Sequence, residues 1–130
     1  MMKFSIITPS FNSGDYIDKT IRSIVGQRRD DIGVELLVID GGSTDTTHDI
    51  LARFHDQIDY IIIEPDRGPA HAINKGLRRA SGAVVAWLNA DDLYYEHCFE
   101  AVASHLTGNP RDSFCFGRCL IIDEKGTEIR

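Results

Sequence analysis

The sequence lacks the features that mark membrane, secreted and nucleic-acid-binding proteins. None of its apolar runs approaches the roughly 20 residues needed to cross a bilayer, and its first residues show no signal-peptide pattern. The formal net charge is −6, so there is no basic excess to hold a phosphate backbone. The three cysteines, Cys98, Cys115 and Cys119, have no Cys-x-x-Cys spacing, which favours free thiols in a reducing compartment. We therefore expect a cytoplasmic protein with no membrane span and no nucleic-acid partner.

Two common phosphate-binding signatures are also missing. The segment that follows the first expected strand, residues 9–14, contains no G-x-G-x-x-G pattern, which weakens a dinucleotide-binding interpretation. The chain has no Walker lysine motif either. The charge of a bound phosphate would therefore have to be met in another way, and a metal ion held by carboxylates is one such way.

What the sequence does contain is an alternation of apolar strands and amphipathic helices. With 42% hydrophobic and 26% charged residues, the 130-residue chain has the composition of one globular domain. Strands are expected at residues 3–8, 34–39, 58–63 and 83–88, and the helices between them carry apolar faces at Ile17, Ile21 and Ile24, at Ile50, Leu51 and Phe54, and at Ile73, Leu77 and Ala80. This order predicts right-handed βαβ crossovers and an α/β fold with a parallel sheet.

The pattern changes after residue 92. Apolar residues at helical spacing predict a helix over residues 96–106, which Gly108 to Pro110 would end. Residues 113–122 are rich in β-branched and aromatic side chains, which predicts a strand, and residues 124–126 read as a hairpin turn after it.

Two adjacent carboxylates, Asp91 and Asp92, follow the fourth strand. Residues 83–88 are all apolar, which indicates a strand buried on both faces with Trp87 in the core. Neighbouring carboxylates repel each other unless a cation or hydrogen-bond donors offset their charge, and oxygen ligands of this kind suit Mg²⁺ or Mn²⁺. The alternative is that Asp91 only caps the following segment. Taken alone, the pair does not decide between these interpretations.

The expected strand order brings more polar residues to the same edge of the sheet. If the first three strands wind in one direction, the fourth pairs on the other side of the first, and a crevice opens where the direction reverses. Thr8 and Ser10, at the end of the first strand, would face the acidic pair across this crevice. Asp40 ends the second strand, where it could accept hydrogen bonds from a ribose or a base. Asp66 precedes the third helix and could either cap it or contact the base.

Two other phosphate chemistries agree less well with the sequence. A receiver-type phosphoacceptor also groups carboxylates at strand ends, but its acidic pair follows the first strand, where this chain has Thr-Pro-Ser at residues 8–10. A nucleotidyltransferase shares the metal-binding carboxylates and the α/β sheet. It predicts a loop rich in Gly, Arg and Lys after the first strand, and residues 9–14 do not form such a loop.

Four motifs, taken together, resemble the family 2 glycosyltransferases of the GT-A fold. They are Ser-Ile-Ile-Thr-Pro-Ser-Phe-Asn at 5–12, Val-Ile-Asp-Gly-Gly-Ser-Thr-Asp at 38–45, Asp-Arg-Gly at 66–68 with Asn-Lys-Gly at 74–76, and Trp-Leu-Asn-Ala-Asp-Asp at 87–92. The motifs occur in the family's order and spacing. The resemblance implies a Rossmann-like three-layer α/β/α sandwich with a mostly parallel central sheet, truncated on its C-terminal side. Residues 1–130 would then be one nucleotide-sugar-binding domain that lacks the acceptor half.

The resemblance also implies roles for residues around the sugar donor. Thr8 and Asp40 would contact the nucleoside, for which uridine is the leading candidate. Ser10 and Asp66 are the other substrate-binding residues that we expect beside the donor. Asp91 would contact the ribose or the sugar.

A divalent cation, Mg²⁺ or Mn²⁺, would be held on the donor diphosphate by Asp91 and Asp92. Asn89 stands where the family often has a further carboxylate. This difference leaves one carboxylate fewer, although the amide still offers a carbonyl oxygen.

The implied reaction is the inverting transfer of a sugar from a UDP-sugar to a hydroxyl of a glycan or lipid-linked acceptor in the full-length protein. The family's general base is expected beyond Arg130. The alternative is a catalytically silent nucleotide-sugar-binding or assembly module. Because the apolar strand expected at residues 113–122 would have an under-protected edge, we also expect a homo-oligomer formed through residues 113–130.

Overall fold

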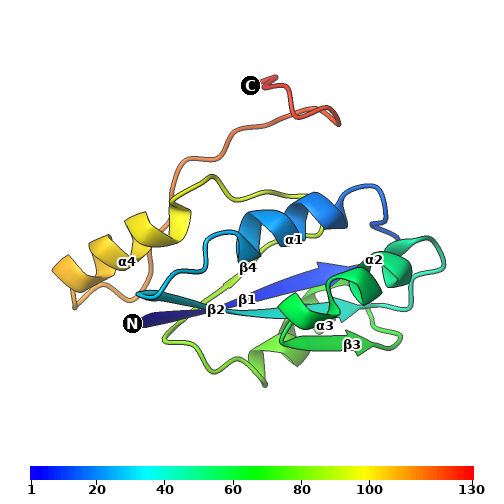
Figure 1. The fold of residues 1–130 in the computed structure, drawn as a ribbon, viewed down its shortest axis with the longest axis horizontal. Helices are drawn as coiled ribbons and strands as arrows, with labels where there is room; N and C mark the ends of the chain where they lie inside the picture. The colour runs from blue at the N-terminus through cyan, green and yellow to red at the C-terminus, as the bar shows by residue number, and fades with distance from the viewer.

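A computed structural model describes all of residues 1–130 and confirms an α/β fold with one parallel sheet (Figure 1). Its elements in chain order are β1 (Met2–Ser10), α1 (Ile17–Val25), β2 (Ile32–Asp40), α2 (Thr47–Arg53), the short 3₁₀ helix η1 (His55–Gln57), β3 (Tyr60–Ile63), α3 (Pro69–Leu77), β4 (Val84–Trp87) and α4 (Cys98–Gly108). The strand order is β3-β2-β1-β4, and every neighbouring pair is parallel. The winding direction therefore reverses between β1 and β4, as the sequence predicts.

Helices cover both faces of this sheet. The larger core joins α1, α2 and α4 to one face of β1 and β2, where Phe4 stacks on Phe99 with ring centroids 4.9 Å apart. The smaller core lies under α3 on the other face and contains Ile7, Leu37, Ile39 and Ala72. Because α3 packs closely on β1, a Cβ added at Gly76 would lie only 2.6 Å from Ile7 Cγ2. The sheet and its two helical layers form the expected sandwich (Figure 1).

A buried carboxylate fixes the start of β4. Glu35 accepts hydrogen bonds from Ser5 Oγ, from the Ser81 amide at 2.9 Å and from Ser81 Oγ at 2.7 Å, and Lys3 Nζ lies 3.2 Å away. The Gly82 amide in turn donates to Ser5 Oγ at 2.7 Å. Burial alone would raise the pKa of Glu35, but the hydrogen bonds from Ser5, Ser81 and Lys3 lower it to about 2. This network joins β1, β2 and the turn that leads from α3 into β4.

Two side chains predicted to pack inward, Trp87 and Leu77, are exposed, and the edge position of β4 explains the exposure of Trp87. Trp87 is 61% exposed and Leu77 is 49% exposed. α3 packs on β1 and β2, while β4 is the edge strand and alternates between half-buried and exposed residues along its length. An apolar run indicates a buried strand, but it carries no information about whether a helix covers both faces at the edge of a sheet.

The strand predicted at residues 113–122 does not form. The structure has only an isolated antiparallel bridge between Ile122 and Glu128 there, and Phe114 and Phe116 are 77% and 90% exposed. A strand needs a neighbour for its backbone groups, and no strand of the sheet pairs with these residues. The predicted hairpin turn is present, because Gly126 N donates to Asp123 O at 2.9 Å. None of the helices combines the length and apolar character required to cross a bilayer.

Candidate functional site

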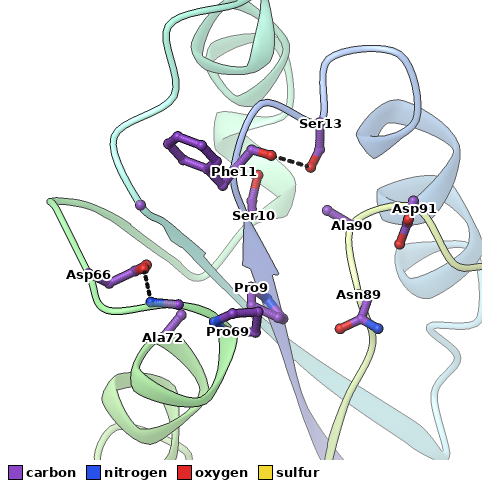
Figure 2. Close-up of a pocket in the computed structure, with 12 residues that line it drawn as sticks. Pro9, Ser10, Phe11, Ser13, Asp66, Pro69, Ala72, Asn89, Ala90 and Asp91 are labelled. Atoms are coloured by element: carbon purple, nitrogen blue, oxygen red, sulfur yellow. Dashed lines mark hydrogen bonds between the residues drawn. The ribbon is translucent and has the colours of Figure 1, made fainter.

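A cavity of about 580 Å³ opens at the C-terminal edge of the sheet, where the strand order reverses between β1 and β4. Four segments line it: the end of β1 and its loop, the loop after β2, the loop that enters α3, and the segment after β4 (Figure 2). The lining residues are Pro9, Ser10, Phe11, Ser13, Gly41, Asp66, Gly68, Pro69, Ala72, Asn89, Ala90 and Asp91.

The cavity brings together three of the residues predicted to form a donor site. Ser10, Asp66 and Asp91 line it, and Figure 2 shows Asp66 and Asp91 on opposite sides of Ser10. Asp66 and Asp91 are the charged residues among the twelve that line the cavity. A diphosphate that enters would therefore meet negative charge from the protein and would need a cation to balance it.

Asp40 lies behind the cavity and is fully buried. Its carboxylate accepts hydrogen bonds from Gly42 N at 3.0 Å, Ser43 N at 2.8 Å and Ser43 Oγ at 2.6 Å, and His48 Nε2 lies 2.8 Å away. Burial alone would raise the pKa of Asp40, but the hydrogen bonds from Ser43 and His48 outweigh it and keep the carboxylate charged. The structure thus places Asp40 at the base of the loop that presents Gly41 to the cavity.

Asp66 approaches the cavity over Gly41. A Cβ added at Gly41 would lie 2.9 Å from Asp66 Oδ2, so the glycine leaves the space that this carboxylate occupies. Asp66 Oδ1 accepts a hydrogen bond from Gly68 N at 2.8 Å, just before α3 (Figure 2). Oδ2 has no hydrogen-bond partner in the protein. Asp66 therefore stabilises the entry into α3 with one oxygen and presents the other next to Gly41.

The two loops that form the upper wall of the cavity are held together by side chains. Asn12 N donates to Ser43 Oγ and Thr44 N donates to Asn12 Oδ1, both at 2.8 Å. Gly14 N donates to Asp45 Oδ2 at 2.9 Å. Asn12 adopts a left-handed backbone conformation with φ 47°, which asparagine tolerates better than most residues. In the sequence, Asn12 and residues 43–45 stand out only as parts of the motifs at 5–12 and 38–45. Their short polar side chains after two neighbouring strand ends were the available signal.

Two hydroxyl groups near the end of β1 have no hydrogen-bond partner. Thr8 Oγ1 and Ser10 Oγ are both buried and unpaired within the protein. Leaving such a group unpaired costs about 1–3 kcal/mol. Ser10 lines the cavity, whereas Thr8 lies behind the lining. Both oxygens are buried, so neither is exposed to the cavity.

The segment after β4 exposes the acidic pair. Asp91 lines the cavity, and Asp92, which is also exposed, follows it in a turn closed by a 3.1 Å hydrogen bond from Asp92 N to Asn89 O. Asn89 Nδ2 lies 3.3 Å from Asp92 Oδ2. The amide of Asn89 thus offers a hydrogen-bond donor to a carboxylate that has another carboxylate beside it in the chain.

These three side chains suit a hard cation that is shared with a substrate. Asn89, Asp91 and Asp92 supply only oxygen ligands, which Mg²⁺ and Mn²⁺ prefer. Nowhere in the structure do three or more His, Cys, Asp or Glu side chains gather as a complete metal site. Mg²⁺ is commonly held by one or two carboxylates, with water and substrate phosphates completing its shell. The residues present fit a cation bound in this way.

Lys75 does not reach the cavity. Its Nζ lies 2.9 Å from Glu64 Oε1 and donates to Pro65 O at 3.2 Å, and its side chain is 11% exposed. The side chain is therefore held within the protein rather than solvated on the polar face of α3. It joins α3 to the end of β3 and leaves the phosphate charge to other groups.

The chain matches known glycosyltransferases in sequence and in structure. Glycosyltransferase TuaG of Bacillus subtilis is 41% identical over 91 residues, which are 68% of this chain and 35% of that protein. The 1–349 segment of S. aureus TarS in complex with UDP-GlcNAc superposes with a TM-score of 0.73 at 27% identity, over 84% of this chain and 32% of that one. Mannosyltransferase PcManGT of Pyrobaculum calidifontis, in complex with GDP-Man and Mn²⁺, has a TM-score of 0.69 at 31% identity. The match covers 82% of this chain and 32% of that one.

The chain spans about a third of the length of these relatives. The sequence profile of glycosyl transferase family 2 matches residues 5–130, which include most of β1, the whole cavity lining and the acidic pair. The chain therefore belongs to glycosyl transferase family 2.

Proposed function

We propose that the cavity binds a nucleoside diphosphate sugar together with Mg²⁺ or Mn²⁺, and that the donor is a UDP-sugar. The observation that carries this proposal is the position of Asp91 at the mouth of the cavity, where β1 and β4 diverge in a family 2 fold. The ligands bound to two relatives support this proposal, since TarS was solved with UDP-GlcNAc and PcManGT with GDP-Man and Mn²⁺.

The nucleoside lies, in this proposal, at the end of the cavity formed by Phe11, Gly41 and Asp66. Phe11 is a largely exposed aromatic side chain on the cavity wall and offers a face on which a base can stack. The free Oδ2 of Asp66 accepts a hydrogen bond from a base N–H or a ribose hydroxyl. Thr8 and Asp40 act from behind this lining, where Asp40 holds the loop that carries Gly41.

The diphosphate lies toward the other end, next to Asn89 and Asp91. Asn89, Asp91 and Asp92 would hold the cation by their oxygens, with the diphosphate as the remaining ligand. When bound, the cation neutralises charge on the leaving diphosphate. The part played by the chain is to present the carboxylates and to orient the donor beside them.

The reaction we propose for the full protein is inverting transfer to a hydroxyl of a glycan or lipid-linked acceptor. The acceptor oxygen forms a bond to the anomeric carbon from the face opposite the diphosphate, the bond to the diphosphate breaks, and a general base takes the hydroxyl proton. We assign that base to a residue outside 1–130, and the roughly threefold greater length of the relatives leaves room for it.

Titration calorimetry of the 130-residue chain with UDP, with and without Mn²⁺, tests the binding proposal. We expect saturable binding that Mn²⁺ strengthens, and we expect Asp92→Ala to remove the metal-dependent part while the thermal midpoint stays level or rises, because carboxylate repulsion is relieved. Asp30→Ala, at an exposed acidic position in the loop before β2, is the matched control. A chain that is folded but gives no saturable heat in either condition would rule the proposal out. UDP binding with no sugar transfer by the full-length protein would favour the silent binding module.

A further inference from the structure

Helix α1 and the turn after it present polar side chains to the segment that carries the acidic pair. Thr20 and Ser23 lie three residues apart on one face of α1, and Gln27 follows in the turn just after the helix ends at Val25. Ser23 Oγ accepts a hydrogen bond from Tyr94 N at 3.2 Å, and Gln27 Oε1 accepts one from Phe99 N at 3.0 Å. Each of the three side chains contacts backbone groups after β4, so α1 and the turn after it hold the path of the chain from the acidic pair to the start of α4.

Thr20 holds the acidic pair itself. Its side chain is fully buried, and its Oγ1 lies 2.9 Å from both Ala90 O and Asp92 O. The two carbonyl groups belong to the residues on either side of Asp91. A hydroxyl has one proton, which these two acceptors share or exchange. One side chain of α1 thus contacts the Ala90–Asp91 and Asp92–Leu93 peptide groups, which flank the acidic pair.

The sheet gives little support at this point, which makes the contact with Thr20 important. β4 ends at Trp87, and the last hydrogen bond that joins this segment to the sheet runs from Leu88 N to Ile7 O at 2.9 Å. Beyond it, a backbone hydrogen bond from Asp92 N to Asn89 O closes a turn within the acidic segment itself. The direction in which Asp91 and Asp92 leave the sheet therefore depends on Thr20.

A buried threonine hydroxyl in a helix can also be satisfied within its own helix, by the carbonyl four residues earlier. For Thr20 this carbonyl belongs to Tyr16, and it lies 3.5 Å from Oγ1. The contacts with Ala90 O and Asp92 O are shorter by 0.6 Å (3.5 Å against 2.9 Å). The hydroxyl is directed at the acidic segment rather than at its own helix.

We propose that Thr20 is a positioning residue for the cation-binding carboxylates: its hydroxyl fixes the backbone on both sides of the acidic pair and so sets the separation and direction of Asp91 and Asp92. The proposal rests on the proposed function, in which these two residues hold the cation. Residues that orient metal ligands typically change metal affinity 10- to 100-fold when they are removed. Thr20 acts through the backbone and touches neither the donor nor the cation.

The test compares Thr20→Val with Thr20→Ser in calorimetric titrations of UDP with and without Mn²⁺. Valine keeps the shape of threonine and removes the hydroxyl, whereas serine keeps the hydroxyl. We expect Thr20→Val to reduce the Mn²⁺-dependent gain in UDP affinity by about 10-fold or more and Thr20→Ser to retain it. Ser23→Ala is the matched control on the same helix face, and it should lower the thermal midpoint without changing the Mn²⁺-dependent gain.

The outcomes separate the two proposals. If the wild-type chain shows no Mn²⁺-dependent gain, the proposed function fails and this inference fails with it. If the wild-type chain shows the gain and Thr20→Val shows the same gain, the role of Thr20 is overturned and the proposed function stands. Should Thr20→Val not fold, Thr20→Ser and Thr20→Cys make the same comparison, because a thiol is a much weaker hydrogen-bond donor than a hydroxyl. Equal gains in that pair would also overturn the inference.

Discussion

Asn89 Nδ2 lies 3.3 Å from Asp92 Oδ2, so the residue that stands in place of a further carboxylate supplies a hydrogen-bond donor to the acidic pair. An amide at this position has two consequences. It reduces the repulsion within the segment when no cation is bound, and it leaves a carbonyl oxygen that can still face a cation.

Replacing this amide by a carboxylate should therefore act in opposite directions on stability and on metal-dependent binding. Without Mn²⁺, Asn89→Asp should lower the free energy of unfolding by about 1 kcal/mol, since a donor is lost and a third carboxylate is added. With Mn²⁺, the same variant should bind UDP more tightly than the wild type. Thermal unfolding and calorimetry, each with and without Mn²⁺, measure the two effects. A variant that binds UDP more weakly in Mn²⁺ would contradict the assignment of residues 89–92 to the cation.

The approach of Asp66 over Gly41 predicts a coupling between these two residues. Gly41→Ala should displace the Asp66 carboxylate, because the new Cβ would lie 2.9 Å from Oδ2, and UDP binding should weaken several-fold with little change in stability. Asp66→Ala should also weaken UDP binding, because it removes the same carboxylate. The double variant should then be no weaker than Asp66→Ala alone, and a double-mutant cycle of UDP affinities tests this. Fully additive effects would show that Gly41 and Asp66 act independently.

The buried Glu35 predicts a defined dependence of stability on pH. Its pKa falls from 4.5 to about 2 in the folded protein, so the unfolded chain takes up this proton at a higher pH than the folded one. The stability contributed by Glu35 is therefore complete above about pH 4.5 and is lost as the pH falls toward 2. Glu35→Gln should be less stable than the wild type at pH 7, by about 2 kcal/mol, and the difference should shrink over that window.

Denaturant titrations from pH 7 to pH 2 measure this difference. Glu124→Gln, in the exposed hairpin turn, is the control and should follow the wild type at every pH. If Glu35→Gln and the wild type differ by a constant amount down to pH 2, the charge of Glu35 does not contribute to the network around Ser81.

The exposed apolar side chains after α4 bear on the association of the chain with itself. Phe114 and Phe116 stack on each other with ring centroids 6.4 Å apart and stand in solvent. We propose that residues 113–130 pair with the same segment of a second copy, since unpaired strand-forming segments tend to find a partner chain. Light scattering over a concentration series should show a homo-oligomer that Ile121→Glu disrupts. A monomeric wild type, or an oligomer indifferent to Ile121→Glu in a folded chain, would refute this.

The sequence predicts the parallel sheet, the reversal next to β1 and the family, because alternating apolar segments and four motifs are local signals. What it does not predict depends on long-range packing. The exposure of Trp87 follows from the edge position of β4, and the missing strand at residues 113–122 follows from the lack of a neighbouring strand. Strand ends such as Asp40 look alike in sequence whether they face a ligand or hold their own loop. In the structure Asp40 holds its own loop through hydrogen bonds from Ser43, and its contact with a nucleoside stays a prediction.

The proposed role of Thr20 likewise could not be predicted from the sequence. A threonine in an amphipathic helix is an ordinary residue, and its contact with Ala90 and Asp92 joins positions 70 and 72 residues apart. Only the packing of α1 beside the segment after β4 brings them together.

The position of the cation tests the central claim most directly. Crystals of the chain grown with UDP and Mn²⁺ and measured at a wavelength where manganese scatters anomalously would locate the ion without reference to any activity. We predict one strong anomalous peak at the mouth of the cavity, within about 2–2.5 Å of a carboxylate oxygen of Asp91 or Asp92 and of a diphosphate oxygen. UDP bound elsewhere, or UDP in the cavity with the manganese peak away from both aspartates, would contradict the account.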